Sequence, residues 1–348
     1  MSLETLFNAS WYGKSHWTKC FYPLMPLVRR FVKKKRQDFI DSEDLLFQSP
    51  VPVIVVGNIT VGGTGKSPMV VALCEFLQSK GYSPGIVSRG YGSKNQEALR
   101  VDSSSSPHQV GDEPLMLTRR TQCPVVIGRQ RVQALEKLLK ECDVDVVISD
   151  DGLQHYALNR DIEIVMVDYE RGFGNGELLP VGPLREPIER LKEVNFITSV
   201  IQSNQSSVVP EYMPQNLAER FSCLQLDAVD LVNLKTGEVA GLSILQRQIS
   251  WHLMAAIGNP NRFLNTLLLL GLREGFTTNW LPDHYKLMVK DIPMHGAVVM
   301  TEKDAVKCLA LDFSNPDVWY LRIKLQLNDD FKFNLINALS NFTKVSSK

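Results

Sequence analysis

The sequence predicts an α/β fold: a parallel sheet with helices on both faces, a smaller second α/β domain and an N-terminal amphipathic helix. Three observations predict it. Short apolar segments alternate with helical ones from Val51 onward, which is the rhythm of a helix-covered parallel sheet. A glycine-rich turn, Thr60–Ser67, separates the first strand of this series from its first helix. A segment that is first aromatic and apolar, then strongly basic, precedes the series at residues 17–36.

The N-terminal segment predicts one amphipathic helix. Leu24, Leu27, Val28 and Phe31 recur at i, i+3, i+4 and i+7 and share a helical face. Most of the basic residues point away from that face, and Lys35 lies on it. They are Arg29, Arg30, Lys33, Lys34, Lys35 and Arg36. Such a helix either binds an anionic membrane surface or packs on the body with its basic end in solvent. Both interpretations stay open on the residues alone.

The following elements alternate regularly. Apolar strands are predicted at Val53–Gly57, Gly85–Ser88, Val125–Ile127, Val144–Ser149 and Ile162–Val167. Helices are predicted from Ser67 to about Lys80, at Pro114–Arg120 and at Gln130–Glu141. After a Gly/Pro-rich stretch, strands resume at Val194–Val200, Leu253–Ile257, Ala297–Met300 and Val318–Ile323. We therefore expect an N-terminal helix in residues 1–40, a first α/β domain in 41–180 and a second in 181–348 that completes a cleft.

The glycine-rich turn reads as a phosphate-binding P-loop. It follows a strand and precedes a helix, so its backbone N–H groups and the helix N-terminus would face phosphate. Lys66 would reach the β- and γ-phosphate oxygens and Ser67 would offer a hydroxyl to Mg²⁺. The residues expected to hold the nucleotide are Thr60, Val61, Gly62, Gly63, Thr64, Gly65, Lys66 and Ser67. Thr60 departs from the motif, which begins with glycine.

Two adjacent carboxylates complete a metal site. Asp150 and Asp151 end the apolar segment that begins at Val144, and a P-loop needs such an acidic partner at a strand end to hold Mg²⁺. The first domain is therefore predicted to be P-loop NTPase-like and to bind ATP and Mg²⁺. A loop-capping role for the two aspartates is the alternative.

Composition excludes several other classes. The 38 Lys+Arg balance the 38 Asp+Glu, so overall charge does not indicate nucleic-acid binding. The six cysteines are widely separated, with no Cys-x-x-Cys pair, which argues against a zinc ribbon or a disulfide framework and fits a reducing compartment. No apolar run reaches the roughly 18–20 residues that span a bilayer, and the first residues do not form a signal peptide. We expect a protein that is cytoplasmic in its bulk.

Several further strings, together with the P-loop, resemble tetraacyldisaccharide 4′-kinase, the lipid A 4′-kinase of Gram-negative bacteria. The strings are Ser88–Gly92, Val110–Pro114, Asp150–His155, Leu179–Glu186, Asp283-His284 and Thr301–Asp304. The resemblance runs from about Trp11 to Lys307. It implies transfer of the ATP γ-phosphate to the 4′-hydroxyl of a tetraacylated glucosamine disaccharide 1-phosphate, giving lipid IVA. It also implies peripheral binding of the N-terminal helix to the cytoplasmic face of the inner membrane.

The resemblance also assigns catalytic residues. It implies that Asp112, assisted by His284, takes the proton of the acceptor hydroxyl, with Lys66 neutralising phosphate charge. On the residues alone, Asp112 is equally well a helix N-cap ahead of Pro114, and His284 an ordinary polar surface residue.

Four arginines are candidates for substrate or phosphate contacts. Arg129 and Arg131 could stabilise the γ-phosphoryl group or the phosphate already on the substrate, or form an exposed basic helix start. Arg89 could act similarly or support its glycine turn. Arg185 is expected in the loop between the domains, near the sugar.

A rival function is a nucleotide-driven P-loop switch or chaperone ATPase. Proteins of that kind place a signature lysine immediately before the glycine pair, where this chain has Val61.

Overall fold

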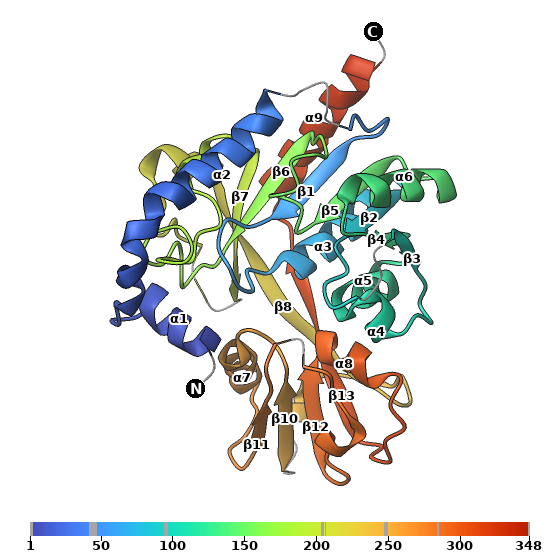
Figure 1. The fold of residues 1–348 in the computed structure, drawn as a ribbon. Helices are drawn as coiled ribbons and strands as arrows, with labels where there is room; N and C mark the ends of the chain where they lie inside the picture. The colour runs from blue at the N-terminus through green and yellow to red at the C-terminus, as the bar shows by residue number, and fades with distance from the viewer. Residues whose placement is uncertain are drawn as a thin grey trace.

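The computed structural model describes residues 3–41, 47–93, 97–202, 205, 207–246, 250–283 and 285–346. Across these residues the strands join into one 13-stranded sheet, in the order β11-β10-β12-β13-β8-β7-β6-β1-β5-β2-β4-β3 with β9 beside β8 (Figure 1). The strands are β1 Val53–Gly57, β2 Pro84–Ser88, β3 Leu99–Val101, β4 Val125–Ile127, β5 Val146–Asp150, β6 Ile162–Val167, β7 Phe196–Gln202, β8 Phe221–Asn233, β9 Val239–Ala240, β10 Trp251–Ala255, β11 Thr277–Trp280, β12 Ala297–Thr301 and β13 Val318–Gln326.

The helices cover this sheet on both faces. The α-helices are α1 Leu3–Trp11, α2 Met25–Ile40, α3 Lys66–Ser79, α4 Pro107–Val110, α5 Asp112–Thr121, α6 Arg131–Glu141, α7 Pro260–Leu269, α8 Glu302–Cys308 and α9 Asp329–Ser346. Short 3₁₀ helices are η1 Trp17–Leu24, η3 Ile188–Lys192, η4 Gln215–Arg220, η5 Leu242–Gln246 and η6 Val289–Asp291.

Strand β1 shows why the sheet needs both layers. Side chains alternate across a strand, so Ile54 and Val56 join the core under α3, α5 and α9, whereas Val53 and Val55 join the core under α2 and α6. All four are buried, the pattern of a central parallel strand covered on both faces. The predicted α/β class, with a parallel sheet covered on both faces, is confirmed.

Two long strands connect the upper and lower parts of the molecule in Figure 1. β8 and β13 pair antiparallel from Asn233–Trp319 to Gln225–Gln326 and extend from the P-loop side of the sheet into the lower part. There β10, β11 and β12 pair in parallel, with α7 against one face and α8 against the other. The C-terminal helix α9 returns to the upper part, where Phe331 packs against Phe196.

The structure contains the predicted strands and helices of the first half, with boundaries shifted by one or two residues. β8, β11 and α9 were not expected. β7, from the segment assigned to the second domain, pairs in parallel with β6. The division into residues 1–40, 41–180 and 181–348 stays a prediction.

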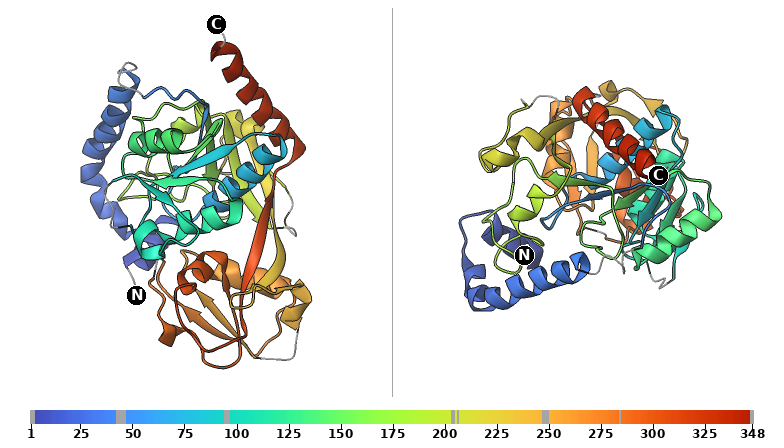
Figure 2. Two further views of the ribbon diagram at one scale, coloured as in Figure 1. Left: turned by 90° about the vertical axis from the view of Figure 1, so that its right-hand side faces the viewer. Right: turned by 90° about the horizontal axis from the view of Figure 1, so that it is seen from above.

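Helix α2 lies along the outside of the body, on the side opposite α9 (Figure 2). The predicted apolar stripe is divided between two environments. Val28 packs against the core beneath α2, as do Met25 and Val32. Leu27 and Phe31 instead are 69% and 68% exposed. Helix α2 therefore has one face packed on the body and one exposed, and its membrane binding stays a prediction.

The basic residues of α2 are divided as well. Arg36 turns toward the body and pairs with Glu193, and Arg29 pairs with Glu177 at 2.9 Å. Arg36 therefore lies on the face of α2 that packs on the protein, and not with the cations that point away from it. Arg30, Lys33 and Lys34 are exposed. None of the helices in the described ranges is long and apolar enough to cross a bilayer.

Candidate active site

The P-loop joins β1 to α3 and takes the conformation that its glycines permit. Gly62 and Gly65 have φ of 109° and 91°, in the left-handed region that favours glycine. A Cβ on Gly65 would lie 2.8 Å from Cγ2 of Val200, so this position excludes any side chain. The hydroxyl of Thr64 is buried and makes no hydrogen bond within the described part of the chain. An unpaired buried hydroxyl in a loop of this shape fits an anionic ligand.

The pairing of Thr60 explains why the first position of the P-loop is threonine and not glycine. It is 2% exposed and forms an antiparallel β-bridge with Leu184. On either side, Val61 N donates to Pro183 O at 2.9 Å and Arg185 N donates to Ile59 O at 2.6 Å. The loop therefore begins as a short strand pair, a conformation that threonine favours and glycine does not. This pairing also joins the P-loop to the Leu179–Glu186 string.

Lys66, Asp151 and Arg185 meet beside the P-loop. Lys66 Nζ lies 3.6 Å from Asp151 Oδ1, and an Arg185 Nη lies 3.3 Å from the same oxygen. Burial would raise the pKa of Asp151, but Lys66 and Arg185 lower it below its usual value. Asp151 also has a φ of 46°, a strained backbone for a non-glycine residue and one that is typical of functional sites.

Asp150 lies deeper, at the end of β5. It is 3% exposed, and Ser88 Oγ donates to its Oδ2 at 3.1 Å. Burial, together with Glu113 and Asp151, raises the pKa of Asp150 to about 6. A carboxylate that is costly to ionise in this way is stabilised by a cation. The two carboxylates and the Ser67 hydroxyl are hard oxygen donors of the kind Mg²⁺ prefers, and Mg²⁺ usually takes one or two carboxylates plus substrate phosphates.

The four candidate arginines occupy different places. Arg89 and Arg185 line the cavity described below, together with the P-loop. Arg131 is 3% exposed and donates to the backbone carbonyls of Gly128 and Asp150, both at 2.9 Å. Its guanidinium thus holds the end of β5 from within the body, and the predicted substrate contact of Arg131 stays a prediction. Arg129 is exposed, and it is not among the described residues that line the cavity.

Asp112 is the first residue of α5 and is 7% exposed. Its Oδ1 accepts a hydrogen bond from Glu113 N at 3.1 Å, and Gly111 occupies the N-cap position. Its Oδ2 faces two ammonium groups, Lys307 Nζ at 3.6 Å and Lys303 Nζ at 3.9 Å. The predicted partner, His284, lies outside the described residues, so the predicted dyad stays a prediction.

One cavity of about 1030 Å³ joins the P-loop, the two carboxylates, Arg89 and Arg185, and Asp112 is not among its described lining residues. P-loop residues 62–67, Asp150 and Asp151 line it from the upper part, and Asn259, Arg262 and Lys303 line it from the lower part. Val28 and Val32 of α2 also line it. The cavity therefore extends from the phosphate loop to the underside of the helix whose outer face exposes Leu27 and Phe31.

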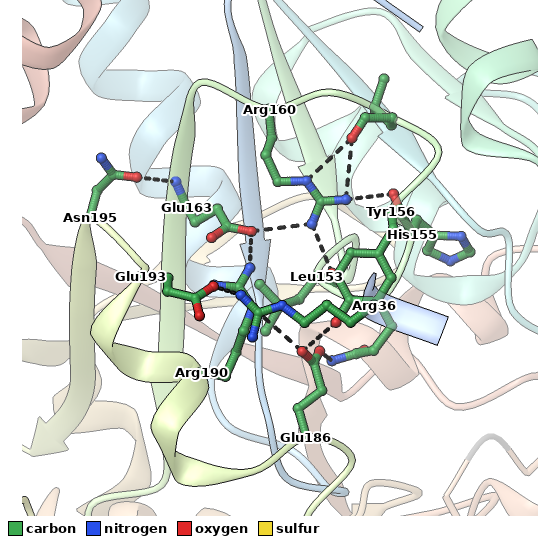
Figure 3. Close-up of polar contacts among 12 residues, drawn as sticks. Arg36, Leu153, His155, Tyr156, Arg160, Glu163, Glu186, Arg190, Glu193 and Asn195 are labelled. Carbon is green, nitrogen blue, oxygen red and sulfur yellow. Dashed lines mark hydrogen bonds and ion pairs between the residues drawn. The ribbon is translucent and has the colours of Figure 1, made fainter. Parts of the chain in front are cut away.

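A buried charged network, which sequence reasoning missed, supports the loops of this site (Figure 3). Glu186 is 2% exposed and accepts hydrogen bonds from Gln154 Nε2 at 2.6 Å and Tyr156 Oη at 2.5 Å. Arg190 pairs with Glu186 at 3.4 Å and also with Glu163. Because Gln154 Nε2 also donates to Asn58 O at 3.0 Å, the network connects the segment after β5 to the end of β1, two residues before the P-loop.

Arg160 also binds the segment that follows β5. It donates to the carbonyls of Leu153 and His155 at 2.8 and 2.6 Å and pairs with Glu163 at 3.2 Å. At the outer end of the network, Arg190 lies 3.7 Å from Glu193, the partner of Arg36 on α2. One signal was available in the sequence: Glu163 interrupts the apolar run Ile162–Val167, and a buried acid of this kind needs a cationic partner.

The fold and the site define an α/β phosphotransferase of the P-loop class. The chain belongs to the tetraacyldisaccharide-1-P 4′-kinase family, whose model matches residues 17–340. It is 43% identical over 329 residues to the tetraacyldisaccharide 4′-kinase of Hahella chejuensis (strain KCTC 2396), covering 92% of each chain. It is 41% identical over 333 residues to the enzyme of that name from Pseudomonas putida (strain W619), covering 93% of each chain.

A solved structure shares the fold. The crystal structure of LpxK from Aquifex aeolicus in complex with ATP matches with a TM-score of 0.75 and 24% identity, covering 93% of this chain and 99% of that one. Family membership makes this chain a kinase and does not favour the switch ATPase alternative.

Proposed function

We propose that this chain transfers the γ-phosphate of ATP to the 4′-hydroxyl of a tetraacylated glucosamine disaccharide 1-phosphate, producing lipid IVA in lipid A biosynthesis. The observation that supports this best is the single cavity that contains the P-loop and Asp150–Asp151 and reaches α2. A nucleotide with Mg²⁺ would occupy the part of the cavity beside the P-loop and Asp150–Asp151. A sugar whose acyl chains stay in a bilayer would enter the cavity beside α2.

In this proposal the residues divide the chemistry. Lys66 and the backbone of residues 60–67 hold the β- and γ-phosphates. Ser67 with Asp150 and Asp151 would hold Mg²⁺, which neutralises charge on the phosphate oxygens. Asp112, with His284, accepts the proton of the 4′-hydroxyl while the hydroxyl oxygen of the sugar bonds to the γ-phosphorus. The bond between that phosphorus and the β,γ-bridging oxygen breaks, and ADP leaves. Arg89 and Arg185, both at the cavity wall, would neutralise phosphate charge.

ATP turnover with and without the disaccharide separates this function from its rival. A kinase of this type consumes ATP at a rate that depends on the acceptor. A switch ATPase hydrolyses ATP without it and is indifferent to its addition, and that result would contradict the proposal.

We further propose that α2 binds the cytoplasmic face of the inner membrane, leaving the protein cytoplasmic and peripheral. Leu27 and Phe31 project from the exposed face, and Arg30, Lys33 and Lys34 are exposed beside them. Apolar side chains flanked by cations are the composition of an interfacial helix.

Replacing Arg30, Lys33 and Lys34 with glutamine is expected to weaken binding to anionic vesicles by on the order of 100-fold. Each cation near such a surface contributes about 1 kcal/mol, so three contribute about 3 kcal/mol. Sedimentation with vesicles of 30 mol% phosphatidylglycerol would measure it, and salt should weaken wild-type binding in the same direction.

The matched control replaces Arg100, Lys137 and Lys140 with glutamine. These lie on β3 and α6, on the far side of the molecule from α2 (Figure 1), so the same charge is lost without an effect on vesicle binding. Equal loss in both triple variants would indicate non-specific attraction. Unchanged binding in the α2 variant would leave α2 as an ordinary packed helix.

A further inference from the structure

Lys303 lies where the two parts of the molecule meet. It belongs to α8, which follows β12 and packs against α5. Its side chain is 15% exposed, and its Nζ lies 3.2 Å from Glu113 Oε1, 3.2 Å from Asp283 Oδ1 and 3.9 Å from Asp112 Oδ2. One ammonium group therefore faces three carboxylates. Two of them come from the first turn of α5, and the third comes from the segment after β11.

The charges around Lys303 keep it protonated. Burial alone would lower the pKa of its amine, but Glu113, Asp112 and Asp283 together raise it above its usual value. Conversely, carboxylates this close to one another need a cation between them, since like charges in a partly buried site repel strongly. Lys303, Glu113 and Asp283 line the cavity, so these three members of the cluster lie at the wall of the proposed reaction site, with Asp112 behind them.

Lys307, one turn further along α8, differs in its contacts. Its Nζ lies 2.8 Å from Asp304 Oδ1, 3.3 Å from Ala256 O and 3.6 Å from Asp112 Oδ2. Asp304 is fully buried and accepts hydrogen bonds from Ala256 N and Thr301 Oγ1. Lys307 is thus anchored within the lower part of the molecule. Both lysines reach Asp112, and Lys303 connects it with Asp283, the residue adjacent to His284.

We propose that Lys303 is a positioning residue for phosphoryl transfer, whose ammonium holds the Asp112 carboxylate against the lower part of the molecule, in place to receive the acceptor proton. The inference rests on the proposed role of Asp112 as proton acceptor. Lys303 acts through Asp112, and it fixes the Asp283 segment against α5 in the same contact. Three carboxylates converge on the Lys303 ammonium, so the site needs a cation at this position.

A double-mutant cycle tests the proposal in the full-length chain with ATP and the disaccharide. Lys303→Met is expected to lower kcat by about 10- to 100-fold while leaving the KM for ATP within about threefold, since a misplaced base slows the chemical step. Lys303→Arg, which keeps the charge, is expected to recover most of the loss. In an Asp112→Asn background, Lys303→Met is expected to change kcat by less than about threefold, because residues that act as a unit are non-additive.

The control is Asp230→Asn. It removes the ion pair with Arg322 between β8 and β13, which is not among the described residues that line the cavity, and is expected to retain activity, so loss of an ion pair alone does not explain the Lys303 effect. Thermal unfolding of each variant shows whether it is folded, and Lys303→Gln, which also removes the charge, takes the place of Lys303→Met in the cycle if Lys303→Met does not fold.

Three results would overturn the inference. A near-normal kcat in Lys303→Met would show that Lys303 does not act on Asp112, and so would an equal fall in kcat in the wild-type and Asp112→Asn backgrounds. The kinase function would stand in both cases. Near-normal kcat in Asp112→Asn itself removes the proposed role of Asp112 and the positioning role with it. The cycle therefore separates failure of the inference from failure of the function on which it rests.

Discussion

Replacing Lys66 with alanine is expected to reduce phosphoryl transfer by on the order of 10³-fold or more, because charge neutralisation at the transferred phosphoryl group carries much of kinase catalysis. Lys66 begins α3, and its ammonium faces Asp151 at 3.6 Å. It fills no part of the apolar core, so the variant is expected to fold. Steady-state kinetics and circular dichroism together measure both expectations.

The matched control is Lys80→Ala, at the C-terminal end of the same helix. It removes the same side chain far from the P-loop and is expected to leave kcat unchanged. Near-normal transfer by Lys66→Ala would show that Thr60–Ser67 is not the phosphate site.

Replacing Asp112 with asparagine is expected to lower kcat by on the order of 10²–10⁴, the range for a positioned acid–base group, with a smaller effect on the KM for ATP. Asparagine is the informative replacement because its amide oxygen can still accept the hydrogen bond from Glu113 N. It removes the carboxylate charge that faces Lys303 and Lys307 and, with it, the proton acceptor. A kcat within a few-fold of wild type would assign Asp112 a structural role at the start of α5.

His284→Ala is expected to be less severe than Asp112→Asn. In the double variant it should add little to the Asp112 loss, as for residues that share one function. Additive losses would place the two residues in separate steps.

The strand–loop–helix geometry around Thr60–Ser67 was predictable because its signals are local in sequence. A strand, a glycine-rich turn and a helix N-terminus follow one another within about 15 residues, and each has a sequence signature. Local sequence could not explain why Thr60 replaces glycine, because the residue that pairs with Thr60, Leu184, is distant along the chain. Only the fold shows that the first P-loop position is a strand position.

The long strand β8 was not predicted because charged residues interrupt its apolar pattern. Its segment, Phe221–Asn233, contains Asp227 and Asp230, residues that strands disfavour. Asp230 pairs with Arg322 on the antiparallel neighbour β13. A cross-strand ion pair between residues so distant in sequence has no local signal.

Periodicity also could not assign the faces of α2 or the role of Arg131. Leu27, Val28 and Phe31 fit one stripe, but only the position of the body decides that Val28 packs and the other two are exposed. Arg131 stands beside Arg129 in a basic string, yet the turn into α6 directs one inward to Asp150 O and leaves the other exposed. Burial of a charged residue depends on carbonyls and carboxylates supplied by distant segments, and periodicity carries no information about them.

The central claim is transfer of the ATP γ-phosphate to the lipid sugar, and the position of the transferred phosphate tests it most directly. The purified chain is incubated with Mg²⁺, γ-labelled ATP and the tetraacylated disaccharide 1-phosphate in mixed micelles, and the lipid product is analysed by mass spectrometry and phosphorus NMR. The predicted result is a bisphosphorylated lipid that carries the label at its 4′ position, with one ADP formed per product. Label released only as inorganic phosphate, or ATP consumed equally without the lipid, would contradict it.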